Sequence, residues 1–476
     1  MYSKLKYLGF CFLIIGGLSS CKTLDTNLVI KEKPVPAAYL NKSDTISIAK
    51  VNWKEYFDDP LLIQLIDTAL LNNPDMSIAL QKIEIARAGV KAAKGSLLPQ
   101  LNAAINGGVR RFGRYTMDGA GNISTEMTPG KIVPVNLPDM FLGFQSSWEI
   151  DLWGKLKSKH QSALTQFLAS TEGARVVSSS LISDIAVSYY ELLALDHELE
   201  IIRQTIQRQQ DALEIVKLQK ETGRTNELAV QQFQAQLLNT RSAEKEILQQ
   251  ITEFENHINF LSGRFPQALE RKKEVLFKEI PKQIQTGLPV QLLENRPDIR
   301  EAELQVKASK FDLKTAKAAF LPGMNLTAGL GFQAFKPEYL FMTPASLTYT
   351  ALGGLIAPLV NLNALKANFS FAKASQLSAM HLYQKRILNG YVEVINQLSA
   401  IKNLQDLGML KKEQNTVLNS SVDMSTELFR TGRASYLEVL LAQQNSLQAK
   451  FELINVNKRQ HIAAVHVYKA LGGGWQ

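Results

Sequence analysis

The second half of this 476-residue chain repeats its first half. Pro74 corresponds to Pro297 and Pro99 to Pro322, at a constant offset of 223 residues and without a gap between them. Farther along, the tripeptide Thr-Gly-Arg occurs at 222–224 and again at 431–433. A repeat of this length indicates a duplicated structural unit and not a solenoid of short repeats. Each copy is predicted to contain a short helix, two strands, a very long helix, a tight turn and a shorter returning helix.

Two segments in each copy alternate between apolar and polar residues. They cover about 97–112 and 141–152 in the first copy and about 321–335 and 346–359 in the second. Such alternation is typical of a strand with one apolar face. Strands of about ten residues with small polar neighbours suit a membrane-spanning β-barrel that is apolar outside and polar within. The alternative is a soluble sandwich in which the apolar faces pack on each other.

The number of strands constrains the assembly. After the N-terminal segment the sequence has no stretch of about 18 apolar residues, so a membrane crossing would have to use strands. Single-chain membrane barrels use about eight strands or more, and open sheet edges cannot persist in lipid. Four strands per chain therefore predict that several copies share one barrel. Loops at 115–139 and 336–346, rich in Gly, Pro, Ser and Thr, are expected to connect the strands at one end.

Four segments are predicted to be long helices, at 155–221, 225–262, 364–431 and 434–471. The first of them contains no proline and would span roughly 100 Å at 1.5 Å per residue. Such lengths exceed those of globular helices several-fold. Apolar residues of the second segment, beginning with Val230, Phe233 and Leu237, are spaced by three and four residues. This spacing predicts coiled-coil packing.

The composition gives no sign of catalysis or of nucleic acid binding. The chain has 53 basic and 44 acidic residues, a net charge of +9 that is spread along its length. No Lys/Arg-rich tract is interleaved with aromatic residues, so nucleic acid is not an expected partner. The six histidines are scattered, and the sequence shows no Cys/His ligand cluster, P-loop or Rossmann glycine pattern. We therefore expect no metal site, no cofactor and no enzyme activity.

The N-terminus has the features of a secretory signal. Lys4 and Lys6 precede an apolar run from Leu8 to Leu18, which ends in Leu18-Ser-Ser-Cys21. The Leu-x-x-Cys pattern resembles the lipobox of bacterial lipoproteins, and it predicts that Cys21 is acylated. The alternative is ordinary cleavage near Ser20, which would leave Cys21 as a free thiol.

The remaining cysteine, Cys11, lies in the segment that is removed, so the mature chain cannot form an internal disulfide. Lys22 follows Cys21, where resemblance to enterobacterial lipoproteins would link Asp to inner-membrane retention, and this favours the outer membrane. We therefore expect a signal peptide (1–20), a lipidated extended segment (21–60) and two structural repeats (61–280 and 281–476).

Four motifs carry a family resemblance. They are Trp53-x-x-x-Phe57-x-Asp59-Pro60, Trp148-Glu149-Ile150-Asp151-Leu152-Trp153-Gly154, Asn295-Arg296-Pro297-Asp298-Ile299 and Ala470-Leu471-Gly472-Gly473-Gly474-Trp475. Together with the duplicated Pro-Asp…Leu-Pro helices, they resemble the lipoprotein (OprM/NodT-like) branch of the TolC-type outer membrane efflux protein family. The resemblance covers essentially the whole mature chain.

The resemblance implies a mixed fold of α-helical coiled coils and membrane strands. Each internally duplicated protomer would give four strands to a trimeric twelve-stranded β-barrel in the outer membrane of a Gram-negative bacterium, continued by a long α-helical barrel in the periplasm. The implied function is the exit duct of a tripartite efflux system, which passively conducts small molecules such as drugs. Its partners would be two further copies of the chain, a periplasmic adaptor protein, an inner-membrane pump of the resistance-nodulation-division type, and outer membrane lipid.

Other functions remain open at this stage. The channel could serve type I protein secretion or metal efflux, although the methionines are dispersed and no Met/His-rich segment supports copper or silver export. A coiled-coil lipoprotein without a channel, such as an adhesin or spacer, agrees poorly with the strand alternation and the duplication.

The resemblance also implies a gate at the periplasmic tip. Glu438 falls where TolC itself has one Asp of an acidic pair, and Leu441 occupies the position of the other. Leu437 matches an apolar constriction residue of the lipoprotein members. We hypothesise that Leu437 and Leu441 close the channel and that Glu438 sets a preference for cations. In the alternative interpretation, Leu437, Leu440 and Leu441 are coiled-coil core.

Further departures from the family pattern weaken the implied hydrogen-bonded lock. Phe429 stands where a Tyr usually donates a hydrogen bond, and Ala229 replaces the Asp that usually receives it. Arg433 keeps the arginine of the tip.

The two turns between the long helices and the returning helices are candidate docking points. Gly223 and Gly432 lie at these turns, where glycine accommodates the left-handed backbone that ends a helix. Because the tips of hairpins are accessible to a partner, we expect the adaptor to dock on six residues: Thr222, Gly223, Arg224, Thr431, Gly432 and Arg433.

Overall fold

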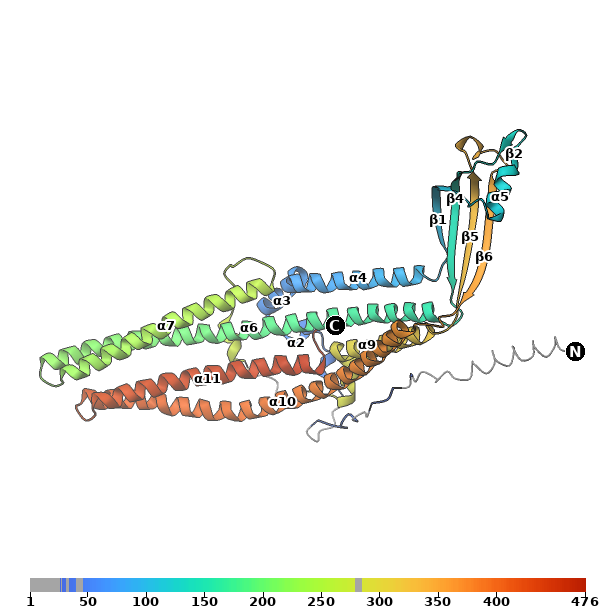
Figure 1. The fold of residues 1–476 in the computed structure, drawn as a ribbon. Coiled ribbons are helices and arrows are strands. Elements are labelled where there is room, and N and C mark those ends of the chain that lie inside the picture. The colour runs from blue at the N-terminus through green and yellow to red at the C-terminus, as the bar shows by residue number, and fades with distance from the viewer. Residues whose placement is uncertain (1–25, 27, 31–33, 40–45, 279–284) are drawn as a thin grey trace. The chain divides into compact units, whose positions relative to one another are not determined.

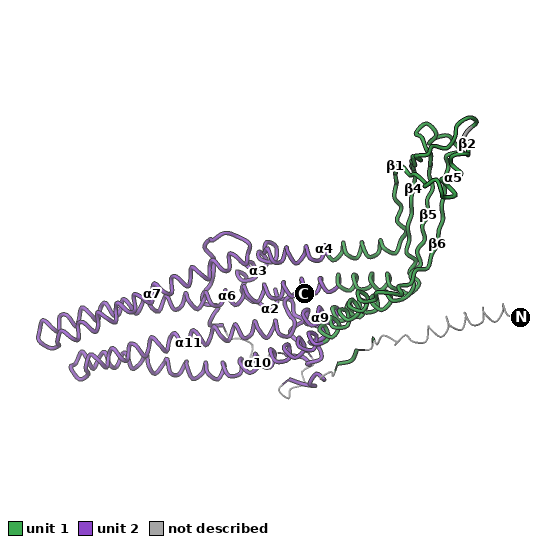
Figure 2. The backbone as a smooth tube through the Cα atoms, viewed as in Figure 1, with its two compact units in different colours: residues 1–31, 86–167, 305–380 green, residues 32–85, 168–304, 381–476 purple. Residues whose placement is uncertain are grey.

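The computed structural model of the chain describes residues 26, 28–30, 34–39, 46–278 and 285–476 (Figure 1). The predicted lipidation site Cys21 lies outside the described residues. The chain forms two compact units, shown in Figure 2, and each draws on both repeats. Unit 1 comprises 1–31, 86–167 and 305–380, and unit 2 comprises 32–85, 168–304 and 381–476.

Unit 1 contains a four-stranded antiparallel sheet with the order β1-β4-β5-β6. Its strands are β1 (Gln100–Arg110), β4 (Leu137–Ile150), β5 (Gly323–Ala334) and β6 (Leu347–Ile356). The central pair joins the two repeats, because β4 belongs to the first and β5 to the second. Strands β1 and β6 are the edges, and no other described strand pairs with their outer sides.

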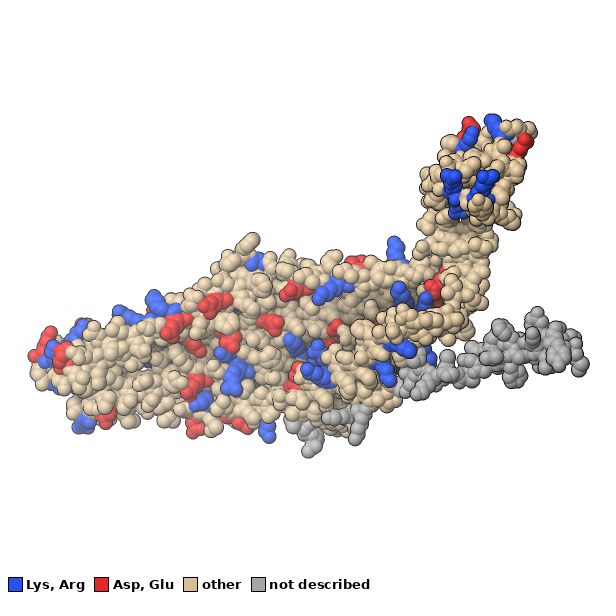
Figure 3. All heavy atoms as spheres, viewed as in Figure 1, with Lys and Arg blue, Asp and Glu red and all other residues tan. Residues whose placement is uncertain are grey.

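One face of the sheet is apolar and exposed. Phe144 lies opposite Ala103 on one side and Leu330 on the other, and Leu330 lies opposite Tyr349. The predicted alternation thus aligns apolar side chains in rows across the four strands. The side chains of Phe144, Leu330 and Tyr349 are 56%, 56% and 79% exposed. In Figure 3 the surface over the middle of the strands is largely uncharged, whereas both charge signs are scattered over the helices.

The opposite face is polar, and its side chains are small at the centre. Gly143 of β4 lies directly opposite Gly331 of β5. A Cβ atom on Gly143 would come within 2.5 Å of the Gly331 Cα and 2.9 Å of the Phe141 ring, so only glycine fits there. Some apolar residues, among them Phe141 and Leu352, share this face. Leu352 interrupts the alternation of β6, which explains why that segment is the least regular in sequence.

The connection between β1 and β4 is more ordered than the expected loop at 115–139. It contains α5 (Met117–Ser124), β2 (Glu126–Thr128) and β3 (Lys131–Ile132). The Thr116 hydroxyl accepts a hydrogen bond from the Gly119 amide at 3.1 Å, which caps α5. The loop at 336–346 holds one short 3-10 helix, η5 (Pro337–Tyr339).

The repeats match closely in their helices. Helix α4 (Pro74–Gly95) and helix α9 (Pro297–Ala318) both have 22 residues, and both begin at the repeated proline. The long helices α6 and α10 have 67 and 68 residues, and the returning helices α7 and α11 have 35 and 36. Their bounds are Lys155–Glu221, Asn363–Arg430, Glu227–Leu261 and Tyr436–Leu471. Within the described residues, every helix is too short or too polar to span a membrane.

Several short elements complete unit 2. They are η2 (Ile48–Lys50), α2 (Trp53–Tyr56), α3 (Pro60–Asn72), η3 (Lys273–Phe277), η4 (Pro289–Gln291) and α8 (Leu292–Asn295). Trp53 and Phe57 of the first sequence motif enter the main core, where they join Tyr189 of α6 and Tyr468 of α11. The motif at 53–60 therefore fixes the N-terminal segment to the long helices.

Asp59, near the end of that motif, accepts two hydrogen bonds through its carboxylate. One of its carboxylate oxygens accepts a hydrogen bond from the Leu61 amide at 3.0 Å and caps α3, whose first residue is Pro60. The other accepts a hydrogen bond from the Tyr189 hydroxyl at 2.6 Å. Burial and this hydrogen bond to Asp59 raise the pKa of Tyr189.

We expect Tyr189→Phe to lower the free energy of unfolding of the helical part by about 1–3 kcal/mol, because the buried Asp59 carboxylate loses one of its two donors. Urea unfolding followed by circular dichroism measures the effect. Tyr436→Phe, at a partly buried site that packs on the cluster near the hairpin tips, serves as a comparison. Equal stability of Tyr189→Phe and the unmodified protein would show that the bond contributes nothing.

Arg296 performs a similar function for the motif at 295–299. Its guanidinium donates to both oxygens of Asp298, at 3.0 and 2.8 Å. It also donates to Glu393 of α10 at 2.7 Å and to the carbonyl oxygen of Ala470 at 2.9 Å. The residue is only 7% exposed. Arg296 thus connects the start of α9 to both helices of the second hairpin.

Candidate functional site

The turns between the long and the returning helices have the geometry that the repeated Thr-Gly-Arg predicts. Gly223 and Gly432 have φ angles of +74° and +73°. The Arg224 amide donates to the Gln219 carbonyl and the Arg433 amide to the Leu428 carbonyl, each at 2.8 Å. These bonds satisfy helix carbonyls that would otherwise be unpaired, in the manner of a Schellman motif.

All six residues of the expected docking surface are exposed. They are Thr222, Gly223 and Arg224 at the first tip and Thr431, Gly432 and Arg433 at the second. Each tip carries one of these arginines, with acidic residues nearby, Glu227 at the first tip and Glu427 at the second. Both tips belong to unit 2, and a partner could reach either turn.

Near the tips the second hairpin packs on the first through apolar side chains. A buried cluster on α6 and α7 consists of Leu213, Val216, Ala229, Val230, Phe233 and Leu237. Phe429 of α10 and Tyr436 and Leu440 of α11 pack against this cluster. The structure therefore brings Phe429 to the cluster that contains Ala229. A hydrogen bond cannot form between these two side chains, and an apolar contact holds the hairpins together instead.

The predicted gate leucines are separate from this cluster. Leu437 and Leu441 lie four residues apart on one face of α11, and they are 50% and 49% exposed in the protomer. Leu440 belongs to the packed side, in agreement with the coiled-core interpretation for that residue. Among the described residues, Leu437 and Leu441 therefore present apolar surface outside the buried cluster.

Glu438 has a local partner that the family resemblance did not suggest. Its carboxylate accepts a hydrogen bond from the Ser435 backbone amide at 2.6 Å. Ser435 is the residue before the first turn of α11, and Ser-x-x-Glu is the sequence signature of a capping box. The sequence therefore contained a signal for this role. Glu438 is exposed, so capping and contact with ions are compatible.

Sequence reasoning missed a charged group between the hairpins. Lys450 of α11 lies near Arg208 of α6 and Asp423 of α10. Burial lowers the pKa of Lys450, the positive charge of Arg208 lowers it further, and Asp423 opposes them. No sequence pattern indicates this group, because its members come from three helices.

A stripe of apolar residues on α10 is exposed in the described part of the protomer. Leu410, Val417 and Met424 follow one another at intervals of seven residues and are 64%, 59% and 66% exposed. A seven-residue apolar repeat is the pattern of a helix that packs on another helix. Exposed leucines also occur on the first hairpin, where Leu218 and Leu238 are 63% and 54% exposed.

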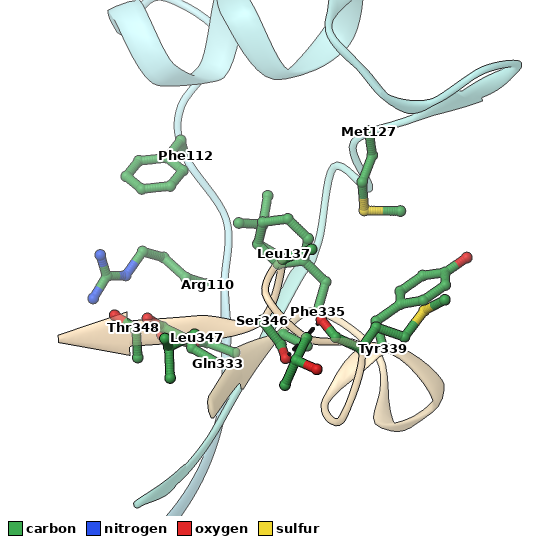
Figure 4. Close-up of a pocket in the computed structure, with 15 residues that line it drawn as sticks. Arg110, Phe112, Met127, Leu137, Gln333, Phe335, Tyr339, Ser346, Leu347 and Thr348 are labelled. Atoms are coloured by element: carbon green, nitrogen blue, oxygen red, sulfur yellow. Dashed lines mark hydrogen bonds between the residues drawn. The ribbon is translucent and has the colours of Figure 1, made fainter. Parts of the chain in front are cut away.

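The sheet carries a cavity of about 820 Å³ at the end where β1 leads into the connection that contains α5 (Figure 4). Its floor is the polar face of the sheet, where the Gln333 amide donates to Asp139 at 2.7 Å. The connecting segments add apolar walls that include Phe112, Tyr339 and Met342. Among the described residues, no group of three or more His, Cys, Asp or Glu side chains is arranged to hold a metal ion.

Comparisons with known proteins agree with this architecture. The model of the family "Outer membrane efflux protein" matches residues 65–264 and 288–473. The chain is 28% identical to the probable outer membrane lipoprotein SilC of Salmonella typhimurium, over 99% of each protein. It is also 28% identical to the solvent efflux pump outer membrane protein SrpC of Pseudomonas putida, over 98% of this chain and 97% of SrpC.

A solved structure of CusC, described in terms of its transmembrane channel formation, is 25% identical and superimposes with a TM-score of 0.79. The match covers 94% of this chain and 99% of that one. The expected fold class is confirmed, since the relatives share the combination of a strand domain with long helical hairpins. Their family consists of channel proteins. This chain belongs to the outer membrane efflux protein family and has the fold of its TolC-type channels.

Proposed function

We propose that three copies of this chain form the exit duct of a tripartite efflux system in the outer membrane. The duct passively conducts small molecules from an inner-membrane pump of the resistance-nodulation-division type and its periplasmic adaptor to the exterior. The exposed tips at 222–224 and 431–433 receive the adaptor. Acylation of Cys21 adds a lipid anchor, as the name of the relative SilC suggests.

The open sheet is the observation that carries this proposal. Strands β1 and β6 each have an unpaired edge among the described strands, and the apolar face is exposed across all four strands. An open edge in lipid leaves backbone groups without hydrogen bonds, which costs several kcal/mol for each group. Pairing β6 of one copy with β1 of the next removes every edge, and three copies give twelve strands.

The stripe at Leu410, Val417 and Met424 supports the same assembly. In the trimer a helix of the neighbouring copy would cover it. The four strands and the stripe thus both need a second copy of the chain, and they lie on different units.

The stripe gives a direct test. We expect Val417→Asp to destabilise the trimer by roughly 1–3 kcal/mol per protomer, because a carboxylate would become buried between copies without a partner. Thr416→Asp adds the same charge at the adjacent exposed position and should have little effect. The loss of heat-resistant trimers on gels measures the difference. Equal heat resistance of the two variants would place the stripe outside the interface.

The conducting function is tested with purified acylated protein in planar bilayers. We expect heat-resistant trimers that carry ion current. A stable monomer in detergent that carries no current would contradict both the trimer and the channel.

Small organic molecules are the proposed cargo, in line with the name of SrpC. A second candidate is metal efflux, because CusC of Escherichia coli is named a cation efflux system protein and is 27% identical. Growth of a deletion strain on solvents and on copper or silver salts separates the two cargoes. Sensitivity to the salts alone would favour metal efflux.

We further propose that Leu437 and Leu441 form the gate at the periplasmic tip, where the three copies meet. Their exposed apolar surface supports this, since it is available for contact with the same residues of the other copies. Phe429, Ala229 and Arg433 act beside the gate: Phe429 packs the second hairpin on the cluster that contains Ala229, and the Arg433 amide closes the turn.

For Glu438 we expect the variant Glu438→Gln to reduce the preference for cations in planar bilayers. Glutamine can still cap the helix, because its side-chain carbonyl accepts the Ser435 hydrogen bond, so the change removes only the charge. Glu413→Gln, at an exposed position of α10, is the matched control. Unchanged ion selectivity in Glu438→Gln would leave Glu438 with its capping role alone.

A further inference from the structure

The most exposed residues of helix α9 are all of one kind. Of its 22 residues only four are exposed, and all four are lysines: Lys307, Lys310, Lys314 and Lys317. Their spacing of three and four residues places them on one face, and the stripe is about 15 Å long at 1.5 Å per residue. We call these four residues the lysine stripe. By contrast, the equivalent helix α4 of the first repeat exposes apolar as well as charged residues, among them Ile85.

The stripe carries little compensating negative charge of its own. Lys310, Lys314 and Lys317 have no acidic residue three or four positions away on the helix. Asp312 is two residues from Lys310 and Lys314, on the opposite side of the helix. Only Lys307 has an acidic neighbour on its face, Glu303. The end of the stripe nearest β5 is therefore the more strongly positive.

The flanks of α9 are already covered within unit 1. Toward α6, the Thr315 hydroxyl donates to the Lys155 carbonyl at 3.5 Å. Toward α10, Leu313 of α9 is buried in a cluster with Phe369 and Ala372. Neighbouring helices thus occupy two sides, and the lysine stripe occupies a third side that no described helix covers.

The N-terminal segment identifies that side as the outside of the assembly. Thr26, Leu28 and Val29 line a groove of about 460 Å³ together with Lys307, Lys310 and Lys314. Leu28 also packs on the buried cluster of Leu313, Phe369 and Ala372. A segment that leads to a membrane anchor has to run over the outer surface of a channel, so the lysines beside it also face outward.

The stripe is also close to the membrane along the chain. Thr26 is five residues from Cys21, a distance of at most about 17 Å. At the other end, β5 begins at Gly323, five residues after α9 ends at Ala318. Lys314 and Lys317 thus lie just before a strand that crosses the bilayer in the proposed assembly.

We propose that the lysine stripe binds the anionic headgroups of phospholipids in the periplasmic leaflet of the outer membrane. Ammonium groups attract phosphate, and each lysine at an anionic surface strengthens binding by about fivefold. The attraction decays within about 8 Å at physiological salt, so Lys314 and Lys317 contribute most. This inference rests on the proposed function, because it needs the strands to lie in the membrane.

Two tryptophans report on the lipid next to this end of the sheet. Trp148 and Trp153 belong to unit 1 and are 37% and 54% exposed. The Trp153 indole donates to the carbonyl oxygen of Pro322, the residue before β5. Brominated lipids quench tryptophan fluorescence on contact, so the full trimer in vesicles can be tested with brominated phosphatidylglycerol and brominated phosphatidylcholine.

We expect the unmodified channel to prefer phosphatidylglycerol about fivefold or more, and 0.5 M NaCl to reduce this preference. In the double variant Lys314→Gln/Lys317→Gln, the ratio of phosphatidylglycerol to phosphatidylcholine binding should fall close to one. In Lys307→Gln/Lys310→Gln this ratio should fall less. The control Lys402→Gln/Lys412→Gln removes two exposed lysines of α10 in the other unit and should change nothing.

Three results would overturn the inference: no preference in the unmodified channel, an unchanged preference in Lys314→Gln/Lys317→Gln, or binding of the lysines to isolated peptidoglycan or inorganic phosphate without any lipid preference. Conductance of the same samples separates this inference from the proposed function. A conducting trimer without lipid preference refutes the inference alone, whereas a sample without conductance refutes the channel.

Discussion

Replacing Leu437 and Leu441 together with serine is expected to raise the open probability of the channel by on the order of tenfold or more. Each leucine is about half exposed in the protomer, and contact with the other copies would bury the remainder, which contributes about 1 kcal/mol per side chain. Six such side chains are lost from the closed trimer. Since 1.4 kcal/mol corresponds to a factor of ten in an equilibrium constant, the closed state loses much of its free-energy advantage over the open state. Serine would also allow water to enter a constriction from which leucine excludes it.

Single-channel recording in planar bilayers measures this effect. The matched control is Leu218→Ser/Leu238→Ser, which removes two exposed leucines from the first hairpin. A change of similar size in the control would attribute the effect to general loosening of the helices. Unaltered conductance of Leu437→Ser/Leu441→Ser would exclude these residues from the gate. In that case the apolar contact of Phe429 with the first hairpin would be the next candidate.

Replacing Arg296 with alanine should lower the stability of the helical part by about 3–5 kcal/mol, because the Asp298 carboxylate, whose side chain is only 15% exposed, would lose its cation. The guanidinium makes four hydrogen bonds that join α9, α10 and α11. Urea unfolding followed by circular dichroism gives the measurement. Arg203→Ala is the control, since it breaks a more exposed pair with Glu244 and should cost about 1 kcal/mol or less. Similar losses of stability in both variants would show that Arg296 contributes no more to stability than the exposed ion pair of Arg203.

The cost of Arg296→Ala should also depend on pH. Burial disfavours the charged form of Asp298, but the hydrogen bond and charge of Arg296 outweigh it and hold the pKa of Asp298 below its ordinary value. A lowered folded-state pKa stabilises the protein above the unfolded pKa of about 3.9. This contribution disappears as the pH falls through the folded-state pKa. The difference in the free energy of unfolding between Arg296→Ala and the unmodified protein should therefore be largest at neutral pH and decrease in acid.

Much of the fold could be predicted because it depends on local periodicity. The proline at position 74 recurs at 297, and the helices that begin there have equal lengths. The long helices have few internal breakers, and the glycines at 223 and 432 end them by backbone geometry alone. The strands follow from alternation, except where Leu352 lies on the polar face. In the connection at 115–139, turn-rich composition concealed a helix and a hairpin, because each is too short to show a period.

The candidate site was harder to predict because it depends on contacts between distant segments. The sequence by itself determined the duplicated elements, their lengths and the number of strands, since each follows from spacing along one segment. Only the tertiary structure decided that Phe429 packs on the cluster containing Ala229, and that Leu437 and Leu441 remain exposed. It also decided that the four residues of α9 in the exposed class are all lysines. Burial depends on which helices become neighbours, and spacing along the chain does not specify that.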